Sequence, residues 1–256
     1  MMQIDVVTIF PDMFAPVLGV SMLKLAQEKG RVRVMLHDLR DYTHDKRRTV
    51  DDRPYGGGPG MVMKPEPIFA AIEAIDARCS STPSTETPEG RVGRAKRGCH
   101  VVLMAPTGVR LTQALASELS QLQHLIIICG HYEGVDERIR QALVDREISI
   151  GDYVLTGGEL PAMVLIDSVV RLLPGVLGHH DATREESFVS GLLEYPQYTR
   201  PPVFRGMEVP EPLRSGHHRH VERWRKLQAV ARTLRDRPDL LHDHTRHATQ
   251  TSQVLS

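Results

Sequence analysis

Apolar positions recur along the first two thirds of the chain in two patterns. Nearly continuous apolar runs predict strands with both faces buried, whereas an apolar residue at every second position predicts one solvated face. The predicted strands span residues 4–10, 31–37, 101–104 and 125–129. The helices predicted between them span residues 22–29, 66–76, 112–119 and 137–144. This alternation of strands and helices predicts an α/β fold around a parallel sheet.

The pattern changes in the last third of the chain. A core helix, apolar nearly all round, is predicted at Glu159–Arg171, and no buried strand is predicted after the polar linker that follows it. Arg214–Arg237 carries eight Arg or Lys against two acids. Its apolar residues recur at helical spacing and predict one packing face opposite a cationic face: Val221, Trp224, Leu227, Ala231 and Leu234. A cationic face suits a phosphate backbone, although a solvated helix has the same composition.

These patterns divide the chain into three parts. We predict a first domain at residues 1–177, a linker at 178–186 and a small, basic, all-α domain at 187–256. Residues 79–98 are rich in Ser, Thr, Pro, Gly and Arg, with few apolar residues to offset the entropy of ordering, and are predicted to be a disordered insertion.

Composition narrows the class of protein. The 256 residues include 32 basic and 32 acidic side chains, so the total charge does not indicate a nucleic-acid binder. The three cysteines form no CxxC pair, which argues against a disulfide framework or a zinc knuckle and fits the reducing cytoplasm. His217, His218 and His220 lack the spacing of a zincin, so no metal ligands are predicted. The sequence shows no signal peptide and no apolar run of 18 residues, so no membrane association is expected.

Three loops punctuated by glycine or proline supply the candidate chemistry. Pro106 and Gly108 are predicted to end one strand, Gly130 follows another, and Ser149–Pro161 comes next in the chain. Ligands of open α/β sheets bind beyond the carboxyl ends of the strands, so these loops predict one pocket. Ser149–Pro161 contains no Lys or Arg, which favours a flat base with polar edges over a triphosphate. An ordinary strand-to-helix turn is the alternative.

A fourth loop, Asp51–Gly60, contains four glycines and two prolines in ten residues. Such a composition excludes a helix or a central strand. It is typical either of a flexible surface loop or of a loop that closes over a ligand.

Long motifs in this sequence resemble the bacterial tRNA (guanine-N1)-methyltransferase family. They span residues 51–61, 129–138, 149–161, 174–178, 198–201 and 216–224. The resemblance covers residues 1–241 and implies an α/β fold of the SPOUT class, with a deep trefoil knot that holds S-adenosylmethionine. It further implies a homodimer with shared active sites, a magnesium requirement, and methylation of N1 of the guanosine immediately 3′ of the anticodon in tRNA.

The resemblance also implies which residues hold the methyl donor. They are Pro106, Gly130, Ile150, Gly151, Asp152, Tyr153, Val154, Leu155 and Gly158. Backbone groups of these residues are expected to hydrogen-bond the adenine edge.

The chemistry needs a base and a cation. Guanine N1 carries a proton at neutral pH, and its removal spreads negative charge to O6. By resemblance the cation is Arg171 and the base is Glu186, which stands where the family has Asp; Asp181 is a weaker candidate. Without catalysis, Arg171 is a helix-terminal cation and Glu186 the first acid of a following helix. His131 stands where the family has Arg, and Glu133 is a weak candidate for magnesium.

Two other functions fit the same motifs. The protein would be a non-catalytic RNA-binding module of the same fold if the change to Glu186 removes activity. A third possibility is a knotted methyltransferase that acts on rRNA or on another tRNA position.

Overall fold

The computed structural model describes residues 1–79, 99–177 and 186–241. The chain forms two compact units, Met1–Gly178 and His179–Ser256, each of which is described by itself. Most of the predicted insertion at 79–98 and nearly all of the predicted linker lie outside the described residues. No helix in the described part of the chain is long and apolar enough to span a membrane.

The first unit is built on a five-stranded sheet in which every pairing is parallel, as predicted. The strands are β1 (Met2–Thr8), β2 (Val32–Asp38), β5 (His100–Arg110), β6 (His124–Cys129) and β7 (Arg146–Ser149). Their order in the sheet is β2-β1-β6-β5-β7, so β6, with every residue buried, lies at the centre. The carboxyl ends of β5, β6 and β7 therefore meet at one edge of the sheet.

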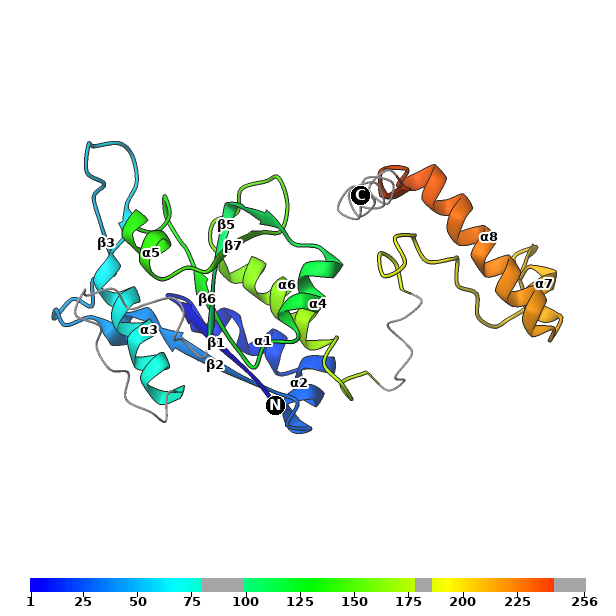
Figure 1. The fold of residues 1–256 in the computed structure, drawn as a ribbon, viewed down its shortest axis with the longest axis horizontal. Coiled ribbons are helices and arrows are strands. Elements are labelled where there is room, and N and C mark those ends of the chain that lie inside the picture. Colours follow the sequence, from blue (N-terminus) through cyan, green and yellow to red (C-terminus); the bar gives the residue numbers. More distant parts are fainter. Residues whose placement is uncertain (80–98, 178–185, 242–256) are drawn as a thin grey trace, which may run out of the picture. The chain divides into compact units, whose positions relative to one another are not determined.

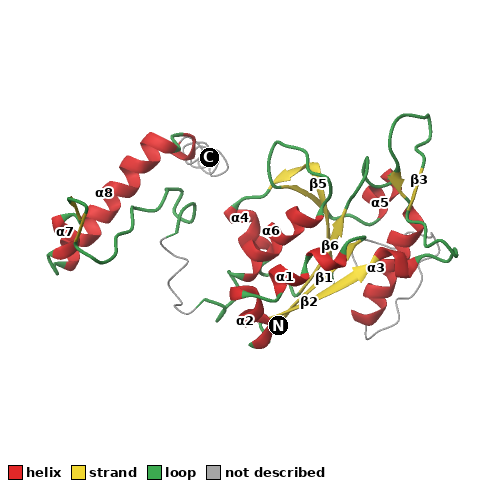
Figure 2. Ribbon diagram, turned by 180° about the vertical axis from the view of Figure 1, so that it is seen from behind, coloured by secondary structure: helices red, strands yellow, loops and turns green. Residues whose placement is uncertain are grey.

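Helices cover both faces of this sheet (Figures 1 and 2). One face carries α1 (Ala15–Leu18), α2 (Ser21–Glu28), α4 (Gln113–Leu119) and α6 (Glu159–Val170). The other face carries α3 (Pro65–Cys79) and α5 (Glu137–Ala142). Successive β6 residues point to opposite faces, so Ile127 packs in the first core and Ile128 in the second. Two cores explain why the central strands have continuous apolar sequences.

Local signals mark the end of α2 and the start of α4, whereas α3 ends at Cys79 and α5 at Ala142 rather than at the predicted 76 and 144. Gly30 follows Lys29, the C-cap of α2, and adopts φ +62°, a conformation that favours glycine at a helix C-terminus. The Thr112 hydroxyl accepts a hydrogen bond from Leu115 N at 3.2 Å and caps the start of α4. Short elements fill the remaining connections: η1 (Pro11–Met13), η2 (Leu39–Tyr42), β3 (Asp51–Asp52) and β4 (Val62–Met63).

The predicted end of a strand at Pro106 is wrong. β5 continues to Arg110, and its pairing with β7 shifts register, because Met104 and Val109 both pair with Ile148. A bulge of this kind accommodates Pro106, which has no N–H to donate to a ladder. Gly108 lies against β7, where a Cβ would be 2.4 Å from the Ile148 nitrogen.

The second unit contains β8 (Val203–Phe204), β9 (Met207–Glu208), α7 (Glu211–Arg214) and α8 (His218–Asp236). The prediction of an all-α domain therefore missed an antiparallel hairpin. Its two turn residues, Arg205 and Gly206, both have positive φ, as in the turns that suit tight hairpins. An Arg-Gly pair is a weaker turn signal than Asn-Gly, so the pattern of the sequence did not indicate it.

The predicted packing face of α8 is also wrong in part. Leu227 and Leu234 are more than half exposed, whereas Thr233 is fully buried. The Thr233 hydroxyl accepts a hydrogen bond from Leu193 N at 2.8 Å and donates one to Ala229 O at 2.7 Å. Thr233 therefore hydrogen-bonds α8 to the segment around Leu193, and a search for apolar periodicity does not detect such a polar contact.

A buried carboxylate lies within the first unit, on β1. Asp5 has no exposed surface, and His37 Nε2 and His124 Nε2 lie 2.5 and 2.7 Å from its two oxygens. Gln3 donates a further hydrogen bond at 2.8 Å. Burial raises the pKa of the Asp5 carboxyl, but the hydrogen bonds from His124, His37 and Gln3 outweigh burial and hold that pKa well below its ordinary value.

Asp5→Asn is expected to lower the free energy of unfolding at pH 7 by about 3 kcal/mol, because the buried histidines lose their charged acceptor. The folded pKa of Asp5 is depressed, so its contribution is present above the unfolded pKa and is lost as the pH falls below about 4. The difference in free energy of unfolding between wild type and Asp5→Asn should therefore become smaller at acidic pH. Urea unfolding at pH 7 and pH 3 measures both effects, with the exposed Asp12→Asn as control. Equal stability of wild type and Asp5→Asn at pH 7 would contradict this role.

Candidate functional site

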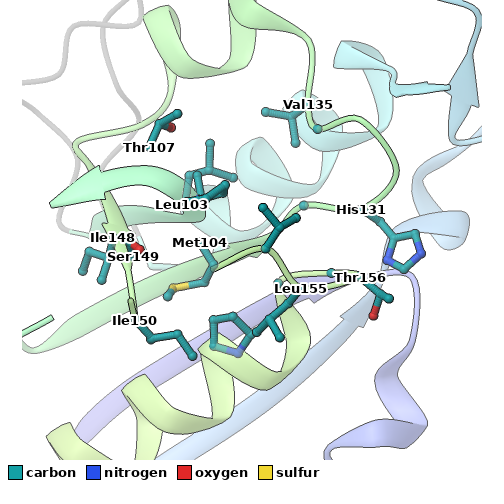
Figure 3. Close-up of a pocket in the computed structure, with 18 of the residues that line it drawn as sticks. Leu103, Met104, Thr107, His131, Val135, Ile148, Ser149, Ile150, Leu155 and Thr156 are labelled. Atoms are coloured by element: carbon teal, nitrogen blue, oxygen red, sulfur yellow. The ribbon is translucent and has the colours of Figure 1, made fainter. Parts of the chain in front are cut away.

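A cavity of about 300 Å³ opens at the carboxyl ends of β5, β6 and β7. It is lined by three segments: 103–107 at the end of β5, 130–135 after β6, and the stretch after β7 that leads into α6. Figure 3 shows Met104, Val135 and Leu155 reaching this cavity from different parts of the chain. The volume and the position at the strand ends are those of a small-ligand site in an open α/β sheet.

Close backbone contacts hold two of these loops together. Gly158 N donates a hydrogen bond to Gly130 O at 2.8 Å, and His131 and Gly157 form an isolated antiparallel bridge. A Cβ on Gly158 would lie 2.8 Å from Cys129 Cα and 2.9 Å from Gly130 N, closer than side chains tolerate. Glycine at 158 therefore allows α6 to begin directly against the end of β6.

The lining of the cavity is mainly apolar side chains and backbone groups. Leu103, Met104, Ile148 and Leu155 supply apolar surface. Arg140 also lines the cavity, but its guanidinium lies 2.8 Å from a Glu147 oxygen and is neutralised by that carboxylate. Such a cavity suits a flat, uncharged group with hydrogen-bonding edges better than a cluster of phosphates.

Eight of the nine residues predicted to hold the methyl donor line this cavity. They are Pro106, Gly130, Ile150, Gly151, Tyr153, Val154, Leu155 and Gly158. The ninth, Asp152, is not among the lining residues; its side chain is 85% exposed and forms an ion pair with Arg110. The structure thus brings the predicted cofactor loops together and leaves the Asp152 side chain outside the cavity.

The two predicted catalytic residues belong to different units. Arg171 is partly buried at the C-terminal end of α6 in the first unit. Glu186 is partly buried at the start of the described part of the second unit. Neither residue lines the cavity, and Asp181 lies outside the described residues.

The expected helix after Glu186 does not form. Residues 187–190 adopt a turn, in which Val189 N donates to Glu186 O at 3.3 Å. Ser187 instead uses its hydroxyl to accept a hydrogen bond from Glu194 N at 2.9 Å. The explanation of Glu186 as an acid at a helix N-terminus is therefore wrong.

Sequence reasoning assigned no role to Glu159, which lies beside the site without lining the cavity. This first residue of α6 is 2% exposed, accepts a hydrogen bond from the Thr8 hydroxyl at 2.8 Å, and places Oε2 4.0 Å from His131 Nδ1. Burial raises the pKa of the neighbouring Cys129 thiol well above its ordinary value, and the charge of Glu159 raises it further, so this thiol is unreactive. An acid in a first helical turn has the same sequence pattern whether exposed or buried, so no signal identified Glu159.

Among residues 1–79, 99–177 and 186–241, no group of three or more His, Cys, Asp or Glu side chains is arranged to hold a metal ion. Glu133 does line the cavity, and Gly60 packs against its carboxylate. The described residues therefore assign no protein ligands to magnesium.

The fold and the cavity define an α/β protein with a small-ligand cavity at the carboxyl edge of a parallel sheet. Residues 2–243 match the family model described as tRNA (Guanine-1)-methyltransferase TrmD, and the chain belongs to this family. A tRNA (guanine-N(1)-)-methyltransferase of Moorella thermoacetica is 58% identical over 94% of this chain and 90% of its own length. The tRNA (guanine-N(1)-)-methyltransferase of Halalkalibacterium halodurans is 53% identical over 99% of this chain and 96% of its own length. The enzyme of the same name from Geobacillus kaustophilus is 54% identical over 95% of this chain and 93% of its own length.

Gly158→Ala is expected to lower the free energy of unfolding by about 2 kcal/mol, because the added methyl overlaps the Cys129 and Gly130 backbone. Gly130→Ala is the matched control, since its Cβ would meet Val135 at an ordinary 3.7 Å. It should change stability by less than about 1 kcal/mol. Chemical unfolding of both variants makes the comparison, and equal losses would refute the steric account.

Proposed function

We propose that this protein transfers the methyl group of S-adenosylmethionine to N1 of the guanosine immediately 3′ of the anticodon in tRNA. One observation carries the proposal: the glycine loops that mark the family fold into one cavity with the size and mainly apolar lining that suit an adenosyl group. The names of relatives at 53–58% identity support the same reaction.

Backbone groups of Ile150, Tyr153 and Leu155 hold the adenine edge, and Pro106 and Gly130 complete the cradle. When bound, S-adenosylmethionine supplies an electrophilic methyl group and leaves as a neutral thioether. The side chains around the cavity exclude water from this group, while Glu159 keeps the start of α6 fixed through Thr8. Asp152 contributes through its backbone alone, since its side chain is paired with Arg110.

Glu186 accepts the N1 proton of the target guanine, so that the N1 electron pair is free to attack the methyl carbon. Such general-base help is worth about 10²–10⁴ in rate. The Arg171 guanidinium stabilises the negative charge that develops on O6. The methylene that Glu186 has beyond Asp lengthens its reach and adds rotamer entropy that must be lost.

We further infer that two copies of the chain form the active sites together. Leu160 and Val164, one turn apart on the most apolar helix of the described chain, are 51% and 47% exposed, and Val154 is 85% exposed. Exposed apolar groups of this kind mark surfaces that a partner covers. In such a homodimer, Glu186 of one copy and Arg171 of the other act on the same guanine. We also propose that the segment of each chain around Gly130 and Gly158 forms a trefoil knot.

The second unit binds the RNA in this proposal. Arg219 and Arg223 are exposed on α8 and are suited to contact phosphates. A protein that acts on tRNA in this way works in the cytoplasm. The magnesium requirement stays a prediction, with no ligand assigned to it.

Methyl transfer to an unmodified tRNA transcript tests the activity. Transfer should be lost when the guanosine 3′ of the anticodon is replaced by adenosine, because adenine has an amino group in place of O6 and offers no oxygen for the Arg171 guanidinium to contact. Labelled donor and filter counting measure it. Unchanged transfer to the adenosine transcript would indicate another RNA site.

Glu186→Gln should lower kcat by about 10²–10⁴, because the amide cannot accept the N1 proton. Glu186→Asp keeps the carboxylate and should retain most of the activity. Calorimetry should find the same affinity for S-adenosylmethionine in both variants, since Glu186 does not line the cavity. A fully active Glu186→Gln would eliminate its role as the base.

Arg171→Ala is expected to lower kcat by about 10²–10³, the loss typical of removing a group that stabilises developing charge. The affinity for S-adenosylmethionine should change little. Single-turnover rates separate the two effects, and an unchanged rate would exclude contact between Arg171 and O6.

A further inference from the structure

The loop between β3 and β4 presents one aromatic ring to solvent. Tyr55 is 102% exposed, the largest value among the exposed large hydrophobic side chains of the described chain. The three glycines that follow it, Gly56, Gly57 and Gly58, adopt positive φ, and no atom lies within 4 Å of a Cβ added to any of them. The ring of Tyr55 gains nothing from burial in this fold, so folding does not explain an aromatic residue at this position.

The base of the same loop is fixed to the wall of the cavity. Glu133 N donates to Met61 O at 3.0 Å, and Met63 N donates to Gly134 O at 2.9 Å. Gly60 approaches Glu133 so closely that a Cβ would lie 2.4 Å from a carboxylate oxygen. Glu133 and Gly134 both line the cavity, so the loop rises directly from its rim.

The tip of the loop is constrained. Pro54 fixes one backbone angle beside the ring and accepts a hydrogen bond from Gly57 N at 3.3 Å. Because this hydrogen bond closes the turn, the loop loses less conformational entropy when Tyr55 binds a partner than an unconstrained loop would.

Cations accompany the ring. Arg53 is exposed two residues before Tyr55, and the Arg138 side chain is 67% exposed. The Arg138 guanidinium is paired with Asp136 through two hydrogen bonds of 2.8 Å, so Arg53 is the more available cation. An exposed ring two residues from an exposed guanidinium is a combination that binds an unpaired base together with its phosphate.

We propose that Tyr55 stacks on an unpaired base of the RNA substrate that flanks the target guanosine, so that the 53–60 loop sets the position of the RNA at the cavity rim. This inference rests on the proposed function and identifies a substrate contact for it. A second copy of the chain is the competing occupant of the ring.

Tyr55→Leu and Tyr55→Phe form the matched pair for the test, because leucine keeps apolar volume without an aromatic face and phenylalanine keeps the face. Stacking on one base is worth about 1–3 kcal/mol, so Tyr55→Leu should raise the KM for tRNA by roughly 5- to 140-fold. Tyr55→Phe should stay within about twofold of wild type. Affinity for S-adenosylmethionine should be the same in all three proteins, because Tyr55 does not line the cavity.

A second readout follows the contact directly. Anticodon-loop RNA with 2-aminopurine beside the target guanosine should change its fluorescence on binding wild type and Tyr55→Phe, and lose that change with Tyr55→Leu. Methyl transfer with an unchanged KM and unchanged fluorescence in Tyr55→Leu would leave the proposed function standing and overturn the stacking. A shift of Tyr55→Leu to another oligomeric state in sedimentation would also overturn it, in favour of a second copy. Tyr55-dependent fluorescence in a wild type that transfers no methyl group would support stacking and refute the proposed function.

Discussion

The hydrogen bond from Gly158 N to Gly130 O is the contact on which the site depends. It forms because Gly158 has no side chain, so the backbone after β6 and the backbone before α6 approach to a distance that a Cβ on Gly158 would not permit. The joined loops and the end of β5 line one cavity. Its walls are mainly apolar side chains and peptide groups, with Glu133 and the Glu147-paired Arg140 also among the lining residues, and such a lining suits an adenosyl group.

Packing keeps this contact in place. The helix α6 buries eight of its twelve residues, including Leu165, Ile166 and Val169, against the first core. Full burial of each such side chain stabilises the fold by about 1.5–3 kcal/mol, far more than one loop hydrogen bond contributes. The sheet fixes where β5, β6 and β7 end, and α6 fixes where the last loop must finish. The cavity is thus a consequence of two rigid elements, which agrees with sites built on scaffolds rather than on free loops.

Some of this could be predicted from the sequence and some could not. Strands β1 and β6 were predictable because two cores demand continuous apolar sequence, and glycine spacing marked the loops of the cavity. The continuation of β5 beyond Pro106 could not be predicted, because the register shift that allows it depends on the partner strand β7. Glu159 was missed because its burial depends on Thr8, 151 residues away. The α8 face was misplaced because helical spacing does not reveal that Thr233 is the buried residue.

Amide hydrogen exchange with and without S-adenosylmethionine tests most directly whether the joined loops hold the methyl donor. Peptide groups that bond the ligand exchange more slowly when it is present. Slower exchange is predicted at residues 150–155 and around Gly130, with α8 unchanged. Equal exchange at these loops, or protection that appears only on α8, would contradict the assignment of the cavity.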